Sequence, residues 1–177
     1  LDMFHAPAGF EIILGNGGAS AFWDAATFSL VEKKGQALVH GEFGNKFANI
    51  LGAPWLEKPT VVSAEPGTRS DLVAESGVDV YAYPHNETSA GVVTDVTRVS
   101  GADADALMLT DATSAAGGID FDPLETDAYY FAPQKNLASD GGLWLALVSP
   151  KAIERIERVA ASGRYIPNIL SLKLALD

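Results

Sequence analysis

Four polar clusters in this 177-residue sequence carry residue types that could bind and activate a small charged molecule. They are a glycine-rich turn at residues 15–20 and three polar runs at residues 85–88, 111–114 and 134–136. Each cluster directly follows a run of apolar residues that is typical of a strand. Because ligands of parallel sheets bind beyond the carboxyl ends of the strands, we expect the four clusters to meet at one edge of a sheet.

The glycine-rich turn indicates an anion site. Backbone N–H groups of the turn, and the dipole of the helix expected to begin at Ser20, both favour a phosphate group. The turn does not match a dinucleotide fingerprint, because Ser20 stands where the last glycine is needed, and no Walker A Gly-Lys-Ser/Thr follows. The alternative is a tight turn that binds nothing.

Asp111 and Lys135 are the candidate reactive groups. Asp111 ends an apolar run, where a buried carboxylate needs a cation or a donor, such as a protonated heterocycle nitrogen. Lys135 follows another apolar run, where partial burial would lower the pKa of its amine and make it a nucleophile or base. The alternatives are a turn-capping aspartate and a solvent-exposed loop lysine. Phe43 either stacks on a planar ring or is a core aromatic.

An anion cradle, a carboxylate and a lysine at strand ends together fit pyridoxal 5'-phosphate (PLP). The cradle would take the phosphate, the aspartate the pyridine nitrogen, and the lysine the aldehyde as a Schiff base. We expect no metal, because His5, His40 and His85 lack the spacing of metal ligands. The sequence has no cysteine, which excludes thiolate metal sites and a cysteine nucleophile within it.

The elements that position these clusters are expected to alternate between strands and helices. Strands are predicted at residues 10–14, 37–40, 60–63, 78–83, 106–109, 128–131 and 143–148. Helices are predicted at residues 20–32, 43–51, 69–76 and 150–162. Several strands are apolar throughout, as strands covered on both faces are. The alternation predicts an α/β fold of three layers, a mostly parallel sheet sandwiched by helices.

Helix-end signals refine these boundaries. Ser20 and Ser149 are predicted N-caps, with Pro150 at the first helical position of the last helix. Gly35 is predicted to end the first helix in the left-handed conformation. Glu154 and Arg158 are spaced to form an ion pair on the outer face of the last helix.

Composition narrows the possible partners. The chain has 12 Lys and Arg against 23 Asp and Glu, a net charge of −11, so nucleic acid is not an expected partner. No apolar run is long enough to span a bilayer, and no basic amphipathic helix is present, so no membrane partner is expected either. The lack of cysteine and of a secretory signal at the start favours a cytoplasmic location.

Four blocks of sequence resemble phosphoserine aminotransferases, in particular the actinobacterial branch of that family. They are residues 15–24, 82–91, 111–114 and 127–136, and the block with Gln134-Lys135-Asn136 is the most specific. The resemblance implies a fold type I, class V PLP enzyme that works as a homodimer. Such enzymes interconvert 3-phosphohydroxypyruvate plus glutamate with O-phosphoserine plus 2-oxoglutarate, in serine and vitamin B6 biosynthesis.

The resemblance also implies a role for each matching residue. Lys135 would form the Schiff base and shuttle the proton, and Asp111 would pair with the ring nitrogen. Thr88 would bond the phenolic oxygen, and Phe43 would stack on the ring where some members have Trp. The phosphate would be held by Gly18, Ala19, Ser20 and Gln134. Some members have Arg at the position of Ala19, so one donor here would be backbone only.

The resemblance covers only part of such an enzyme. Residues 1–177 correspond to a single PLP-binding large domain, expected to be truncated at both ends, without the N-terminal segment or the C-terminal small domain. Those missing parts carry the arginines that hold the substrate in the family. The alternatives are another class V enzyme, such as an alanine–glyoxylate-type aminotransferase or a cysteine desulfurase, or a catalytically inactive fragment.

Overall fold

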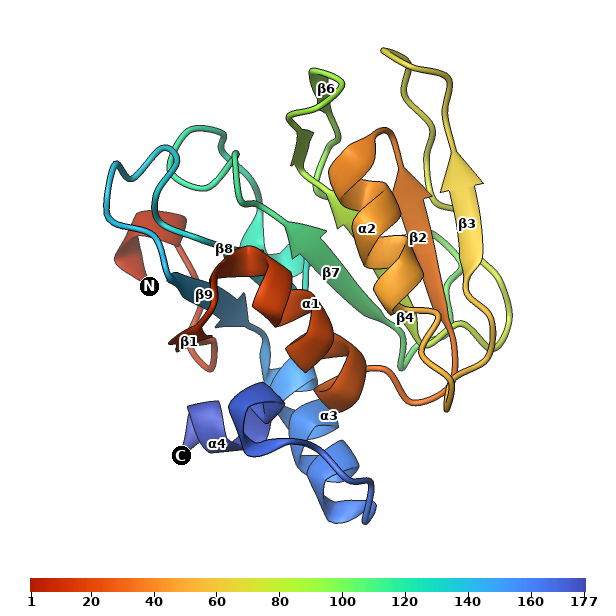
Figure 1. Ribbon diagram of the computed structural model, residues 1–177, viewed down its shortest axis with the longest axis vertical. Helices are drawn as coiled ribbons and strands as arrows, with labels where there is room; N and C mark the ends of the chain where they lie inside the picture. Colours follow the sequence, from red (N-terminus) through yellow and green to blue (C-terminus); the bar gives the residue numbers. More distant parts are fainter.

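A seven-stranded sheet forms the centre of the computed structural model, which describes residues 1–177 (Figure 1). Across the sheet, the strand order is β1-β9-β8-β7-β4-β2-β3. In chain order these strands are β1 (Glu11–Asn16), β2 (Gly35–Val39), β3 (Thr60–Ser63), β4 (Val80–Pro84), β7 (Leu107–Asp111), β8 (Ala128–Phe131) and β9 (Leu143–Val148). Only β9 runs antiparallel to its neighbours, so the predicted mostly parallel sheet is confirmed.

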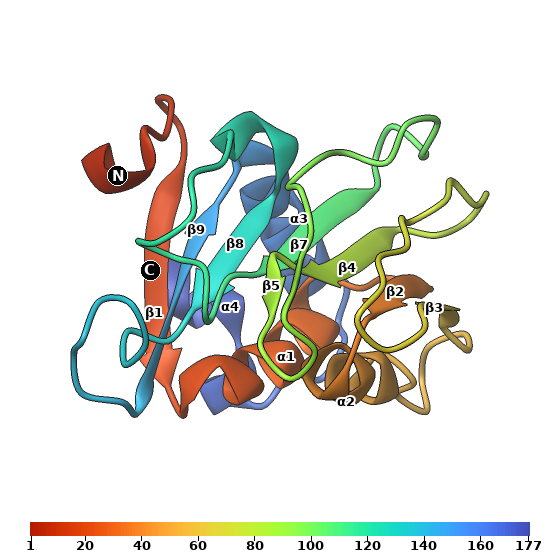
Figure 2. The same cartoon turned by 90° about the horizontal axis from the view of Figure 1, so that it is seen from above.

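The α-helices pack together on one face of this sheet. They are α1 (Gly18–Ser29), α2 (Glu42–Ile50), α3 (Pro150–Ala161) and α4 (Leu172–Leu176). The largest hydrophobic cluster joins all four to the sheet, with Phe22 of α1, Phe47 of α2 and Ile156 of α3 among its buried members. Seen from above, α1 and α2 lie along one side of the strands (Figure 2).

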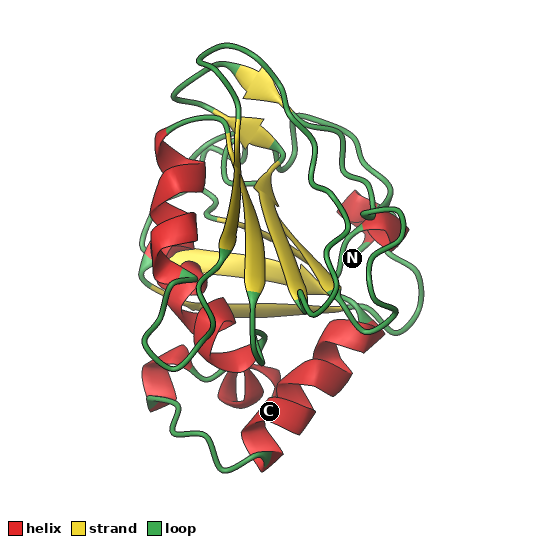
Figure 3. Cartoon of the chain, turned by 90° about the vertical axis from the view of Figure 1, so that its right-hand side faces the viewer, coloured by secondary structure: helices red, strands yellow, loops and turns green.

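Loops and short elements cover the opposite face. Two 3-10 helices, η1 (Asp2–Phe4) and η2 (Pro123–Glu125), precede or join strands there, and a small hairpin pairs β5 (Asn86–Glu87) with β6 (Val92–Val93). The third 3-10 helix, η3 (Asn168–Leu170), instead packs on α1, where the Leu170 carbonyl accepts from the Ser29 hydroxyl. Phe4 of η1 packs on Tyr129 and Phe131 of β8. Figure 3 shows loops on this side of the strands and, apart from η1 near the N-terminus, helices on the other.

Strand β8 shows why the predicted strands lack polar alternation. Tyr129 and Phe131 face the cluster under the loops, whereas Ala128 and Tyr130 face the cluster under the helices. All four residues are buried, because both faces of the sheet are covered. The α/β fold class with a mostly parallel sheet is therefore confirmed, whereas in this chain the second face of the predicted sandwich is covered by loops and short elements instead of α-helices.

Two helix-end predictions for α1 are wrong. The helix begins at Gly18, after an N-cap at Gly17 with a φ of 104°, so Ser20 lies within the first turn and caps nothing. A left-handed glycine turns the chain out of β1 without needing a side-chain cap. The helix ends at Ser29, and Gly35 starts β2 instead of ending α1.

No helix forms at residues 69–76, where one was predicted. Side chains from neighbouring strands take the backbone N–H groups there: Gln36 Oε1 accepts from Val73 at 3.0 Å, and the Tyr81 hydroxyl accepts from Glu75 at 3.0 Å. These bonds replace the helical ones and hold the segment against the sheet.

The prediction for α3 is confirmed at its start, where the Ser149 side chain accepts from the N–H of Ala152.

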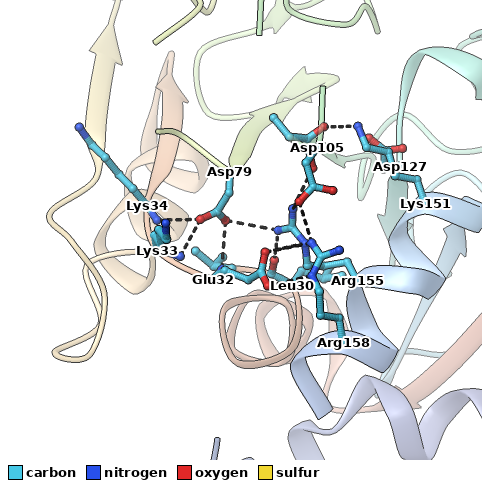
Figure 4. Close-up of polar contacts among 12 residues, drawn as sticks. Leu30, Glu32, Lys33, Lys34, Asp79, Asp105, Asp127, Lys151, Arg155 and Arg158 are labelled. Carbon is cyan, nitrogen blue, oxygen red and sulfur yellow. Dashed lines mark hydrogen bonds and ion pairs between the residues drawn. The ribbon is translucent and has the colours of Figure 1, made fainter. Parts of the chain in front are cut away.

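An ion cluster around the buried guanidinium of Arg155 ties the amino ends of several strands together. Arg155 of α3 is 1% exposed, and its guanidinium lies 3.1 Å from Glu32, 3.4 Å from Asp79 and 3.1 Å from Asp105. Figure 4 shows Asp79 and Asp105 reaching this group from two sides. Arg158 pairs with Glu32 and Asp105 as well, so the predicted Glu154–Arg158 pair is wrong. The cluster fixes the segments that lead into β2, β4 and β7.

Replacing Arg155 with methionine is expected to lower the free energy of unfolding by about 3 kcal/mol, because it leaves Asp79 without its buried cationic partner. Urea unfolding followed by circular dichroism measures the change. The matched control is Arg69→Met, which breaks an exposed pair with Asp95 and should cost less than about 1 kcal/mol. Equal losses in the two variants would contradict a stabilising role for the cluster.

Candidate functional site

A cavity of about 480 Å³ lies at the carboxyl edge of the sheet. Strands β1, β2, β4, β7 and β8 all end there, because they run in the same direction. The cavity brings together all eight site residues predicted from the sequence: Gly18, Ala19, Ser20, Phe43, Thr88, Asp111, Gln134 and Lys135. Five separate chain segments thus contribute to one site.

The glycine-rich turn forms one wall of the cavity. Gly17 and Gly18 have φ values of 104° and 70°, a region that residues with side chains rarely adopt. The N–H of Gly17 donates to the carbonyl of Gly142 at 2.9 Å, which fixes the turn beside the start of β9. Helix α1 then begins without a side-chain cap, so the amides of its first turn and its dipole suit an anion.

Asp111, the last residue of β7, is held by neutral donors alone. One carboxylate oxygen accepts from the backbone N–H and the hydroxyl of Thr113, at 2.9 and 2.6 Å. The other accepts from the indole Nε1 of Trp23 at 3.2 Å. Burial raises the pKa of Asp111 above its ordinary value, and these three hydrogen bonds oppose the rise. A carboxylate in this setting would gain from a cationic N–H donor.

Lys135 lies on the loop that follows β8 and is exposed. The predicted partial burial of this lysine is wrong in this structure, because every residue of the loop 134–142 between β8 and β9 is exposed. The loop is closed by a hydrogen bond from the N–H of Ala138 to the carbonyl of Lys135, at 3.0 Å. Lys135 is the one lysine among the cavity-lining residues.

Phe43 and Thr88 come from the other side of the cavity. Phe43, in the first turn of α2, is 38% exposed, so the alternative of a core aromatic is wrong. Its position is set by the buried carboxylate of Glu87, which accepts from the N–H of Gly44 at 2.9 Å. Thr88 donates from its hydroxyl to the Ser114 hydroxyl at 2.7 Å.

Sequence reasoning missed Trp23 as a residue of the site. Trp23 lies on the buried face of α1, where it is 4% exposed and stacks with Phe47 at a centroid distance of 5.9 Å. The indole N–H was the available signal, because a buried tryptophan usually bonds its N–H to a polar partner. Asn86, Thr113 and Ser114 also line the cavity, although the sequence analysis gave them no individual role.

His85 belongs to one of the four clusters but lies away from the cavity. It is 2% exposed, and its Nδ1 is 3.0 Å from the Tyr129 hydroxyl, beneath the loops on the opposite face. Burial lowers the pKa of His85 below its ordinary value, and the charge of Asp95 opposes this in part.

This buried histidine predicts a pH dependence of stability. The unfolded chain binds the proton at about pH 6.5, whereas the folded chain resists it. The contribution of neutral His85 is therefore complete above pH 6.5 and is lost as the pH falls through the lower folded pKa. Urea unfolding between pH 5 and 8 should give a steeper fall for the wild type than for His85→Gln. If the free energies of unfolding of the two proteins fell in parallel with pH, His85 would not be the source of the pH dependence.

No group of three or more His, Cys, Asp or Glu side chains is arranged to hold a metal ion. No helix of the chain is long and apolar enough to cross a bilayer.

The chain is similar to known proteins over nearly its whole length. It is 54% identical over 178 residues to a phosphoserine aminotransferase of Nocardioides sp., covering 99% of this chain and 48% of that protein. It is 49% identical to the phosphoserine aminotransferase of Rhodococcus jostii, covering 99% of this chain and 47% of that protein. The chain therefore spans about half the length of the curated relatives it matches.

Solved structures show the same fold. A phosphoserine aminotransferase from Cytophaga hutchinsonii superposes with a TM-score of 0.91 at 24% identity, over 99% of this chain and 50% of that one. The ureidoglycine–glyoxylate aminotransferase of Bacillus subtilis gives 0.82 at 21% identity, over 97% and 46%. The family profile described as aminotransferase class-V matches residues 66–173. The chain belongs to the class-V aminotransferase family.

Proposed function

We propose that the chain is the cofactor-binding part of a PLP-dependent aminotransferase that interconverts O-phosphoserine plus 2-oxoglutarate with 3-phosphohydroxypyruvate plus glutamate. The observation that carries the proposal is the meeting of an anion-binding turn, a carboxylate without a cationic partner and a lysine in one cavity. The names of the relatives about 50% identical to this chain support the choice of substrate.

The cavity fits the proposed cofactor in size and in chemistry. Its volume of about 480 Å³ is in the usual range for small-molecule sites, about 300–1,000 Å³. The first turn of α1, with Gly18, Ala19 and Ser20, offers backbone donors to a phosphate. The carboxylate of Asp111 would pair with the protonated pyridine nitrogen. Burial disfavours the charged form of Asp111, so a cationic partner would stabilise it.

Each remaining residue has a proposed task around the bound cofactor. Gln134 would add a side-chain donor to the phosphate, Phe43 would cover the ring, and Thr88 would donate to the ring oxygen. PLP supplies an electron sink that stabilises negative charge at Cα of the amino-acid substrate. The amine of Lys135 would hold the cofactor covalently between turnovers and then carry the proton to and from Cα.

The working protein is proposed to be a cytoplasmic homodimer, in which residues 1–177 form the large-domain part of each subunit. The assignment follows the resemblance of the four sequence blocks, and it places the groups that hold the substrate carboxylate and phosphate on segments outside this chain. Serine and vitamin B6 biosynthesis would be the pathways served.

A substrate panel tests the proposal. The full-length subunit proposed above, which includes residues 1–177 and the segments that hold the substrate, is loaded with PLP. It is then incubated with 2-oxoglutarate plus O-phosphoserine, with glyoxylate plus alanine, and with cysteine alone. Glutamate should form from O-phosphoserine at least tenfold faster than glycine forms from alanine, with no sulfide from cysteine. Faster reaction of alanine or cysteine would favour another class V activity, and no turnover by the loaded full-length subunit would favour a catalytically inactive protein. Either result would contradict the proposed function.

A further inference from the structure

Trp23, Asp111 and Tyr130 form a polar cluster beneath the cavity. Tyr130 of β8 is the register partner of Asp111 on β7, and the N–H of Ala112 donates to the carbonyl of Tyr130 at 2.8 Å. Trp23 reaches the same carboxylate from α1 through its 3.2 Å indole bond. Asp111 on β7 therefore lies between Trp23 of the helix α1 and Tyr130 of the neighbouring strand β8.

The Tyr130 hydroxyl is fully buried and has no hydrogen-bond partner. An unpaired buried polar group costs about 1–3 kcal/mol, so a phenylalanine at this position would give a more stable core. Burial and the neighbouring charge of Asp111 raise the pKa of Tyr130 well above its ordinary value, so the hydroxyl keeps its proton and remains a donor. The chain retains a donor beside Asp111 that its folded core does not use.

Aromatic packing fixes both donors in place. The Tyr130 ring stacks on Phe22 at 4.4 Å and meets Phe47 edge to face at 6.1 Å. Phe47 also stacks with Trp23, at an interplanar angle of 14°. Phenylalanine at position 130 would preserve this packing and remove only an O–H group. Phenylalanine at position 23 would remove the N–H together with part of the indole ring, a loss of volume that a second buried tryptophan, Trp144, can control for.

We propose that Trp23 and Tyr130 are positioning residues for Asp111. The Trp23 indole fixes the carboxylate opposite Thr113, so that its remaining lone pairs face the cavity. The Tyr130 hydroxyl provides a further donor to the carboxylate when a cationic N–H enters the cavity and Asp111 adjusts to meet it. This inference rests on the proposed function, in which that cation is the protonated pyridine nitrogen of PLP.

The test compares Trp23→Phe and Tyr130→Phe with Trp144→Phe as the matched control. Trp144 is equally buried and packs on Phe22, but it makes no hydrogen bond to Asp111. The first readout needs no cofactor: the carboxyl carbon of Asp111 is titrated by NMR. Trp23→Phe should raise the pKa of Asp111, because a hydrogen bond to the charged form is lost, while Trp144→Phe should leave it unchanged.

The second readout is the affinity for PLP, together with the nitrogen-15 chemical shift of its ring as a function of pH. Trp23→Phe should weaken binding by about tenfold and deprotonate the ring nitrogen at lower pH. Tyr130→Phe should leave the pKa of Asp111 unchanged in the cofactor-free protein and should not lower the free energy of unfolding. It should nevertheless weaken PLP binding severalfold. Variants that match Trp144→Phe in both readouts would overturn the inference.

Failure of the proposed function would look different. Wild-type protein that binds no PLP would contradict the function, but the cofactor-free titration of Asp111 would still test the role of Trp23. Wild-type protein that binds PLP, with Trp23→Phe and Tyr130→Phe binding it equally well, would contradict the positioning role alone.

Discussion

Lys135→Ala is expected to abolish the covalent attachment of PLP while leaving the fold and the cavity intact. Lys135 supplies the one lysine amine at the cavity, and its exposed side chain makes no ion pair whose loss would destabilise the fold. The visible absorbance of PLP bound through a lysine should disappear in the variant. Binding of pyridoxamine phosphate, which needs no lysine, should persist because Asp111 and the first turn of α1 remain.

Lys46→Ala is the matched control for this loss. Lys46 is also an exposed lysine near the site, with its amine 5.5 Å from the centre of the Phe43 ring, but it does not line the cavity. The control should keep the absorbance of the wild type. Retention of that absorbance by Lys135→Ala, or its loss in Lys46→Ala, would show that another amine holds the cofactor.

In the full-length enzyme proposed above, Asp111→Asn is expected to lower turnover with O-phosphoserine by about a thousandfold and to weaken PLP binding. Loss of one preorganised electrostatic partner at a reacting group typically costs about 10²–10³-fold in rate. Asparagine can still accept from Thr113, but its amide cannot balance the positive charge of a protonated ring nitrogen. Steady-state kinetics and a PLP titration in the same protein measure the two effects.

Asp24→Asn removes the same charge next to Trp23, on the exposed side of α1, and serves as the control. Turnover in this variant should stay within about twofold of the wild type, because charges exposed to water are strongly screened. Wild-type activity in Asp111→Asn would show that Asp111 does not act on the cofactor.

The gathering of the site could be predicted from the sequence because it depends on strand direction alone. Once β1, β4, β7 and β8 run the same way, the residues that follow them must share an edge. Gly18 and Lys135 follow β1 and β8 within a few residues, and Asp111 is the last residue of β7. Their presence at one cavity could therefore be predicted without knowledge of side-chain packing.

Features that depend on contacts between distant segments could not be predicted. Val73 bonds to the Gln36 side chain instead of to its own segment, so the local helix pattern at residues 69–76 was misleading. The bond from Trp23 to Asp111 joins residues 88 apart in the sequence, and no periodicity reports such a bond. The exposure of Lys135 likewise depends on how its loop leaves the sheet edge, which composition does not determine.

Covalent labelling of the wild-type protein tests the central claim most directly. The protein is incubated with PLP, reduced with borohydride and digested, and the peptides are mapped by mass spectrometry. The site described above predicts one pyridoxyl group per chain, on Lys135, in the peptide that follows β8. Labelling spread over surface lysines such as Lys46 and Lys58, or no labelling at all, would contradict a PLP site in this cavity.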